Sequence, residues 1–310
     1  MVNLHDRLKP LGRILNLKAE GWTVWDCSPI FGEDGRVHVF ATRWPDSDQP
    51  DRTWFLGGSQ IIHAVAPAPQ GPYEVADVVV SCDGGDEKWN SSGVINPKIY
   101  RVADRYCLIH TGCTAQRMDT QAIGMLTATS LDGPWTEVSD DAPIVDQPGI
   151  CNNPALLQHP NGQFWIYYKS GFGGVEGMNI GLAIADRLEG PYRKYENNPL
   201  IDPEVVKRHR KLEDPYAWHN EQGFWLLCNK VGTADGPAGL LFHSADGVDW
   251  ETPVPGYPNP VDFRGYRQRL EEPNLLFRDG KPTHLFNIMG ACPEDPVYSG
   301  FVFAIEPASA

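Results

Sequence analysis

The feature that most constrains this chain is a proline-centred segment that returns about every sixty residues. In each copy a polar or acidic residue precedes the proline and apolar residues follow it. The prolines at the centres of the five copies are Pro29, Pro97, Pro154, Pro215 and Pro273. Five similar units of this length indicate a repeat architecture, in which each unit packs against its neighbours.

A second signature, glycine-proline-aromatic, recurs in the later part of each unit. Between the signatures lie runs of alternating apolar and polar residues, separated by turn sequences such as Asn161-Gly162. Runs of this kind predict β-strands joined by tight turns. The signature begins at Gly71, Gly133 and Gly190, and a changed copy begins at Gly247.

We therefore predict that each unit folds as strand, turn, strand, loop, strand, turn and strand, in that order. Four antiparallel strands repeated five times predict an all-β fold, a five-bladed β-propeller, which closes sheets radially and leaves little exposed edge. An α-solenoid would need helical periodicity, which the chain lacks. We expect residues 1–21 to be a lead-in segment of weak helical or coil character and residues 22–310 to form a single propeller domain.

Composition excludes several partners. The chain has 40 acidic and 26 basic residues and a formal charge of −14, which disfavours nucleic acid and anionic membranes because both require basic patches. It offers no apolar run long enough to span a membrane and no signal-peptide pattern at its start, so we expect a cytoplasmic protein. Seven scattered cysteines without a CxxC pair favour reduced thiols.

The innermost strand of a propeller blade lines the central channel, so the five proline-centred segments should converge at one mouth. Carboxylates repel one another, and gathering them at one axis indicates acid–base chemistry or cation binding. The long connections 43–59 and 83–92 are candidates for walls or lids. The acids expected at the mouth are Asp26, Glu213, Asp214, Glu271 and Glu272, and the amides are Asn96, Asn152 and Asn153.

Taken together, the segments resemble the furanosidase-type glycoside hydrolases of families 43 and 117. The likeness covers residues 22–305 and depends on the order and spacing of short motifs. These are WDCSPI at Trp25, NPKIY at Asn96, NPA at Asn153, EDPYAW at Glu213 and EPNLL at Glu272. The resemblance implies hydrolysis of a glycosidic bond by a general base, a general acid and a third carboxyl group that tunes them.

The resemblance places the base at Asp26 and the acid at Glu213. Blade three has Asn153 where the family has an aspartate, so Asp214 or Glu272 is expected to supply the third carboxyl group. Inverting glycosidases hold their two carboxyl groups roughly 6.5–9.5 Å apart, and acids on blades one and four favour that wider gap. We therefore expect an exo-acting, inverting enzyme that removes a terminal furanose-type or anhydro sugar from a short oligosaccharide.

Two alternatives remain open. A phosphorolytic or other carbohydrate-active enzyme on the same scaffold would use Lys169, Lys230 and Arg43 to bind phosphate. A non-catalytic sugar-binding propeller would explain Asn153 as a mark of lost activity.

The remaining candidates surround the mouth. We expect no required cofactor. Some related propellers bind a central cation, so a structural calcium ion in the channel is a candidate, with His284 as a metal ligand. The oligomeric state is not predicted. The residues expected to bind substrate are Trp25, Arg43, Trp44, Asn96, Asn153, Lys169, Lys230 and Glu271.

Overall fold

The structure is a computed structural model. It describes residues 4–14, 21–45, 58–82, 88–115, 117–171, 178–209, 211–230, 239–258, 261–263, 266–290 and 298–307. The two connections expected to act as lids fall partly outside these residues, at 46–57 and 83–87.

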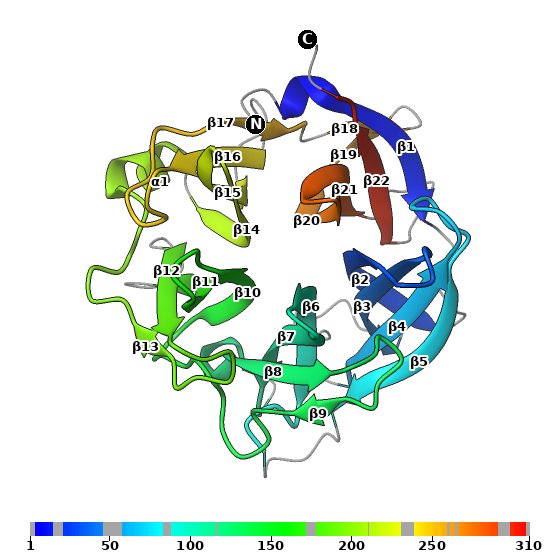
Figure 1. The fold of residues 1–310 in the computed structure, drawn as a ribbon, viewed down its shortest axis with the longest axis horizontal. Helices are drawn as coiled ribbons and strands as arrows, with labels where there is room; N and C mark the ends of the chain where they lie inside the picture. The colour runs from blue at the N-terminus through cyan, green and yellow to red at the C-terminus, as the bar shows by residue number, and fades with distance from the viewer. Residues whose placement is uncertain are drawn as a thin grey trace.

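Five four-stranded antiparallel sheets stand around a central axis, as Figure 1 shows. Blade one contains β2 (Trp22–Phe31), β3 (Val37–Pro45), β4 (Gln60–Ala66) and β5 (Glu74–Ser81). Blade two contains β6 (Gly93–Val102), β7 (Arg105–Cys113), β8 (Ala122–Ala128) and β9 (Thr136–Glu137). Blade three contains β10 (Cys151–Gln158), β11 (Phe164–Gly171), β12 (Met178–Ala185) and β13 (Arg193–Lys194).

The last two blades complete the ring. Blade four contains β14 (Leu212–Asn220), β15 (Gly223–Lys230), β16 (Gly239–Ser244) and β17 (Val254–Tyr257). Blade five contains β20 (Leu270–Arg278), β21 (Lys281–Met289), β22 (Ser299–Ile305) and β1 (Leu8–Ile14). Outside the blades lie η1 (His5–Arg7), η4 (Met118–Thr120), α1 (Pro203–His209) and the hairpin of β18 (Val261–Phe263) and β19 (Tyr266–Gln268). The five-bladed propeller expected from the sequence is confirmed.

The expected boundary between a lead-in and the propeller is wrong. Residues 8–14 form β1, which pairs antiparallel with β22 from Leu8 opposite Ile305 to Ile14 opposite Gly300. The first strand of the chain is thus the outermost strand of the last blade, and it closes the ring between the two ends of the chain (Figure 1). Strand pairing over such a sequence separation leaves no local pattern in the segment.

The apolar core lies between the blades rather than within any one of them. Five clusters of buried hydrophobic residues each join one pair of neighbouring blades, and the cluster between blades five and one includes Ile14 from β1. No sheet can bury its faces alone, because each uses a neighbour on both sides. The ring is therefore the smallest unit that buries the whole core.

The glycine-proline-aromatic signature follows the third strand in blades one to three, and its changed copy does so in blade four. Its glycine has a positive φ of 89° at Gly71, 79° at Gly133 and 89° at Gly190, and Gly247 in the changed copy has 83°. Only glycine adopts this conformation without steric cost, so the signature is a turn that leads into the outer strand. Among the described residues, no helix is long and apolar enough to cross a membrane.

Candidate functional site

The innermost strand of every blade contains a β-bulge. The pairing register skips two residues in β2, β6, β10, β14 and β20. The first skipped residue has a positive φ in each blade, although none is glycine. Left-handed backbone costs an L-residue about 1–2 kcal/mol, and such strain gathers at functional sites. These residues, called the inner ring below, are Asp26 (61°), Asn96 (55°), Asn153 (49°), Asp214 (55°) and Glu272 (50°).

The bulges show that one of the five proline-centred segments was matched to the others at the wrong residue. In blades two to five a proline follows the inner-ring residue directly, but in blade one Cys27 follows Asp26. Pro29 pairs with Val39 in the regular part of the ladder and is not equivalent to the other four prolines. The bulged register therefore defines the repeat, and proline accompanies it in four of the five blades.

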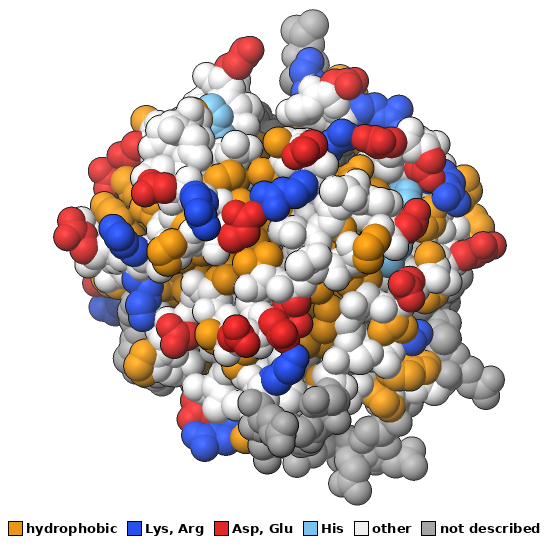
Figure 2. All heavy atoms as spheres, turned by 60° about the horizontal axis from the view of Figure 1, so that its bottom comes forward, with side chains coloured by type: hydrophobic (Ala, Val, Ile, Leu, Met, Phe, Trp, Pro, Cys, Tyr) orange, Lys and Arg blue, Asp and Glu red, His pale blue; other side chains and the backbone are white. Residues whose placement is uncertain are grey.

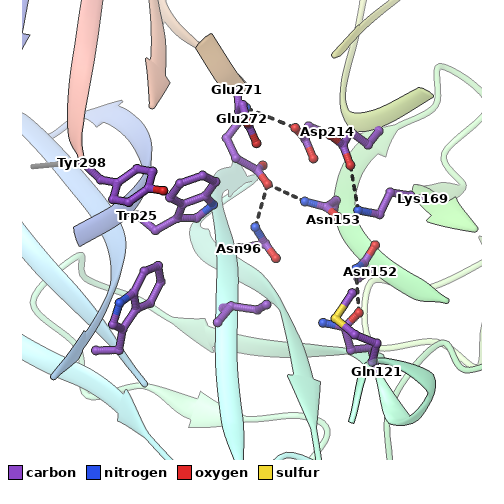
Figure 3. A pocket seen from close by; sticks show the side chains of 14 residues that line it. Trp25, Asn96, Gln121, Asn152, Asn153, Lys169, Asp214, Glu271, Glu272 and Tyr298 are labelled. Carbon is purple, nitrogen blue, oxygen red and sulfur yellow. Dashed lines mark hydrogen bonds and ion pairs between the residues drawn. The ribbon is translucent and has the colours of Figure 1, made fainter. Parts of the chain in front are cut away.

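Inner-ring side chains are buried and bond to one another across the channel. Asn96 Nδ2 donates to Asp26 Oδ1 at 3.2 Å and to Glu272 Oε1 at 2.7 Å. Asn153 Nδ2 donates to the same oxygen of Glu272. Blades two and three do not adjoin blade five, so these bonds span the channel (Figure 3). Glu272 therefore links blade five to blades two and three through hydrogen bonds.

The other two carboxylates of the inner ring are held by neighbouring strands. Asp26 Oδ2 accepts hydrogen bonds from the Thr42 hydroxyl at 2.9 Å and from the backbone N–H of Asn96 at 3.1 Å. Asp214 Oδ2 accepts from Asn229 Nδ2 at 3.2 Å and from the backbone N–H of Glu272 at 3.3 Å. In each case one donor comes from the second strand of the same blade and the other from the bulge of the next blade.

A buried lysine that sequence reasoning missed lies beside this ring. Lys98 is 1% exposed, and its Nζ donates to the backbone oxygen of Pro215 at 2.5 Å. Its strand belongs to blade two and Pro215 to blade four, so the side chain crosses the channel. A lysine between apolar neighbours in a predicted inner strand was the available signal, because buried charges require a partner.

Burial changes the protonation of the ring. Burial raises the pKa of Asp26 to about 7, the Thr42 hydrogen bond opposes the rise and the charge of Asp214 adds to it. Burial likewise raises the pKa of Asp214 and of Glu272, and it lowers the pKa of Lys98. The three acids therefore keep protons at a pH at which exposed carboxyl groups have lost theirs.

The residue before each inner-ring residue forms a second, outer layer that opens into a pocket of about 210 Å³. Apart from Asp26, the inner ring also lines this pocket, and Asn96 links Asp26 to it. The outer layer consists of Trp25, Ile95, Asn152, Glu213 and Glu271. The other lining residues are Trp44, Met118, Gln121, Lys169 and Tyr298.

One wall of the pocket is aromatic and another is polar, as Figure 3 shows. The Trp25 ring lies 5.2 Å from that of Tyr298 and 6.3 Å from that of Trp44, measured between centroids. On the polar side, Asn152 Nδ2 donates to Gln121 Oε1 at 2.6 Å. Aromatic faces pack on apolar ligand surfaces and fixed amides orient polar groups. A sugar ring offers both kinds of surface.

The outer layer holds two glutamates at equivalent positions of β14 and β20. Glu213 pairs with Lys169, whose Nζ lies 3.0 Å from Oε2, and with Arg269 at 3.4 Å. Glu271 pairs with Arg269 at 3.1 Å. Burial alone would lower the pKa of Lys169, but the charges of Glu213 and Asp214 outweigh it and raise the pKa.

Two basic residues expected in the site lie elsewhere. Arg43 donates from Nε to Gln60 at 2.9 Å and stacks over the Trp22 ring at 4.3 Å. Lys230 pairs in register with Leu212, whereas Lys169 pairs with an outer-layer residue, Asn152. Side chains alternate between faces along a strand, so a shift of one position turns a residue away. Neither Arg43 nor Lys230 lines the pocket.

His284 does not reach the channel. It pairs in register with Leu276, four residues beyond Glu272 along β20, and its Nδ1 contacts Thr283. Among the described residues the central carboxylates that could hold a cation are those of Glu213, Asp214 and Glu271. The Lys169 ammonium and the Arg269 guanidinium already pair with this group, so these residues do not fit a calcium ion held by His284.

Basic side chains do not gather on the face drawn in Figure 2. Among its described residues, Lys and Arg lie interspersed with Asp and Glu rather than in one basic patch.

No protein-family model matches the chain. Among curated proteins, an extracellular endo-α-(1→5)-L-arabinanase from Thermotoga petrophila is 26% identical over 88 residues, which are 24% of this chain and 19% of that protein. The chain thus matches about a fifth of the length of this relative.

Solved structures match over nearly the whole chain. Zg3597, a family 117 glycoside hydrolase of Zobellia galactanivorans, has a TM-score of 0.73 at 17% identity and covers 98% of this chain and 92% of its own. CoXyl43, a family 43 β-xylosidase/α-arabinofuranosidase from a compost metagenome, has a TM-score of 0.64 at 13% identity and covers 95% of this chain and 94% of its own. A structure from family 130, a family of mannoside phosphorylases that also contains glycoside hydrolases, has a TM-score of 0.64 at 16% identity. It covers 93% of this chain and 86% of its own. The chain therefore has the five-bladed propeller fold of glycoside hydrolases of families 43 and 117, as its sequence resemblance implied.

Proposed function

We propose that this protein is an exo-acting, inverting glycoside hydrolase that removes a terminal sugar from a short oligosaccharide. The observation that carries the proposal is the convergence of four carboxyl groups at one pocket with an aromatic wall and an amide wall, while Asn96 links a fifth, that of Asp26, to the pocket. Clustered acids destabilise a fold through repulsion and burial, and this ring also holds strained backbone. Such costs are expected where the arrangement performs chemistry.

The pocket supports a neutral sugar residue as the bound group. Its volume of about 210 Å³ is below the roughly 300–1,000 Å³ of pockets that hold drug-sized ligands. Three buried atoms of its polar wall lack hydrogen-bond partners among the described residues: Gln121 Nε2, Asn152 Oδ1 and Asn153 Oδ1. One donor and two acceptors at a pocket surface suit sugar hydroxyl groups, which both donate and accept. A small pocket favours exo action.

The proposed reaction separates its two proton transfers between the two layers. Asp26 accepts the proton of the attacking water, and an outer-layer glutamate, Glu213 or Glu271, protonates the leaving oxygen. Asp214 and Glu272 provide the third carboxyl function in place of the family aspartate at Asn153. Asp26 lies in the buried ring of blade one and the donors lie on blades four and five. Inversion requires the two carboxyl groups to stand roughly 6.5–9.5 Å apart, with the attacking water between them.

Phosphorolysis is the weaker alternative. It would need Lys169, Lys230 and Arg43 to bind phosphate together, but of these only Lys169 lines the pocket, where it is paired with Glu213. An anion entering there would meet four carboxyl groups of the lining. Turnover that depends on added inorganic phosphate would nevertheless favour it over hydrolysis.

A panel of 4-nitrophenyl glycosides, including furanosides, tests the proposal. We expect phosphate-independent release of nitrophenol from at least one, and NMR should show the first sugar released with inverted anomeric configuration. Asp26→Asn should lower kcat/KM at least 100-fold, since a general base contributes about 10²–10⁴. Asp186→Asn, at the outer end of blade three, is the control. Failure of every glycoside in the panel, with sugar binding intact, would support the non-catalytic alternative.

A further inference from the structure

The two outer-layer glutamates occupy the same place in neighbouring blades but have different partners. Glu213 and Glu271 each precede an inner-ring residue, and each lines the pocket. One carboxylate oxygen from each of them and one from Asp214 lie within 4.8 Å of one another. Two carboxyl groups so close cannot both ionise freely, so their partners decide which of them keeps a proton.

Glu213 is surrounded by donors. Lys169 Nζ lies 3.0 Å from its Oε2, and Asn229 Nδ2 and Arg269 Nη2 lie 3.3 Å and 3.4 Å from its Oε1. Both oxygens therefore accept hydrogen bonds, two of them from cations. A proton on Glu213 would displace one of these donors and leave the Lys169 ammonium, which is 10% exposed, without its anion. Glu213 is therefore poorly placed to donate a proton to a ligand.

Fewer donors stabilise a negative charge on Glu271. Its side-chain partner among the described residues is Arg269, 3.1 Å from Oε1, and this guanidinium is 45% exposed and shared with Glu213. Burial raises the pKa of Glu271 to about 7; the charges of Glu213 and Asp214 add to the rise, while those of Arg269 and Lys169 oppose it. The Tyr257 hydroxyl on β17, whose own pKa is raised by burial, also faces this group.

We propose that Glu271, and not Glu213, gives the proton to the leaving oxygen, because donors already contact both oxygens of Glu213. This rests on the proposed glycosidase function. As the bond between the anomeric carbon and the glycosidic oxygen breaks, its electron pair goes to that oxygen, which takes the proton of Glu271. Water attacks the anomeric carbon and passes a proton to Asp26. Exchange with solvent restores both carboxyl groups, so one water is consumed in each cycle.

Leaving-group dependence distinguishes the two glutamates. A good leaving group needs no protonation, so loss of the acid is felt only with a poor one. For one sugar, 4-nitrophenyl and phenyl glycosides are compared with Glu271→Gln and Glu213→Gln. We expect Glu271→Gln to lose at least 100-fold in kcat/KM on the phenyl glycoside but less than tenfold on the nitrophenyl one, and to lose the alkaline limb of its pH profile. Glu213→Gln should slow both substrates alike and keep that limb.

The reverse pattern would overturn the assignment to Glu271. Glu204→Gln, exposed on α1, is the matched control and should leave both rates unchanged. A measurement without turnover separates this inference from the proposed function: ¹³C NMR of protein labelled at glutamate Cδ. The signal absent in Glu271→Gln should titrate near pH 7 in the wild type. If no glycoside is cleaved, the glycosidase proposal fails, whereas a Glu271 signal already ionised at pH 6 refutes the proton assignment.

Discussion

The inner ring and the outer layer are made of adjacent residues on the same five strands, yet their acidic side chains differ in exposure, partners and backbone conformation. Inner-ring side chains are at most 5% exposed, hydrogen-bond across the channel and sit on left-handed backbone. The two outer-layer glutamates are 13% and 24% exposed and pair with cations at the pocket. A single bulge turns consecutive side chains into two different environments.

The comparison teaches that, apart from the proposed base Asp26, the inner ring mainly supports the structure and the outer layer mainly faces the ligand. Beside and within the ring, Lys98, Asn96 and Asn153 hold carboxyl groups that would otherwise repel one another, so changes of these three residues should act mainly on stability. In the outer layer the side chains face a cavity, so changes should act mainly on binding and turnover. The predictions below test this division.

The largest expected effect is loss of the buried cation. Lys98→Met keeps the length of the side chain but leaves the ring acids without their ammonium and Pro215 O without its donor. We expect the free energy of unfolding to fall by about 3–5 kcal/mol, the usual cost of breaking a buried charge pair. Urea unfolding measures it. Lys207→Met, on α1 with its side chain 79% exposed, is the control and should change stability by less than about 0.5 kcal/mol.

The raised pKa values predict how stability changes with pH. Asp26 and Glu271 titrate at about 7 in the folded protein, and at about 4 when unfolded. Between these values the folded state binds more protons, so the stability they contribute is full below about pH 4 and is lost as pH rises through 7. The urea midpoint should fall between pH 5 and pH 8, less steeply in Glu271→Gln. A midpoint that rises over this range would contradict the raised values.

An outer-layer aromatic should affect binding rather than folding. Trp25→Ala removes a ring that contacts Trp44 and Tyr298 on the pocket wall. We expect KM for a cleaved glycoside to rise five- to tenfold, about 1–1.4 kcal/mol, with kcat changed less. Steady-state kinetics on the wild type and variant measure this. An unchanged KM with a large loss of stability would place Trp25 with the structural ring instead.

The smallest effect tests the strained backbone. Ala103 has a φ of 54° in the exposed turn between β6 and β7, so Ala103→Gly should stabilise the protein by about 0.5–1 kcal/mol. Asn153→Gly relieves the same strain inside the ring but removes the bond to Glu272, so it should destabilise by about 1–2 kcal/mol. Thermal unfolding compares the two. Stabilisation by both would show that the ring bond contributes little.

The sequence by itself determined the repeat, the five blades and most of the pocket. Acids and amides at matching places along the chain, such as Asp214 and Asn153, could be placed at one mouth because repeat position fixes angular position in a ring. Resemblance to known families then supplied expected roles for individual residues. These inferences needed only periodicity, which a single chain displays.

Only the tertiary structure decided which layer each residue joins. The register of strand pairing sets which side chains face the pocket, so Lys169 lines it while Lys230 and Arg43 do not. The closure of blade five by β1 and the reach of Lys98 across the channel are contacts between distant segments. Periodicity fixes where a residue lies around the ring. Register and long-range contacts, which depend on the whole fold, fix where its side chain points and what it touches.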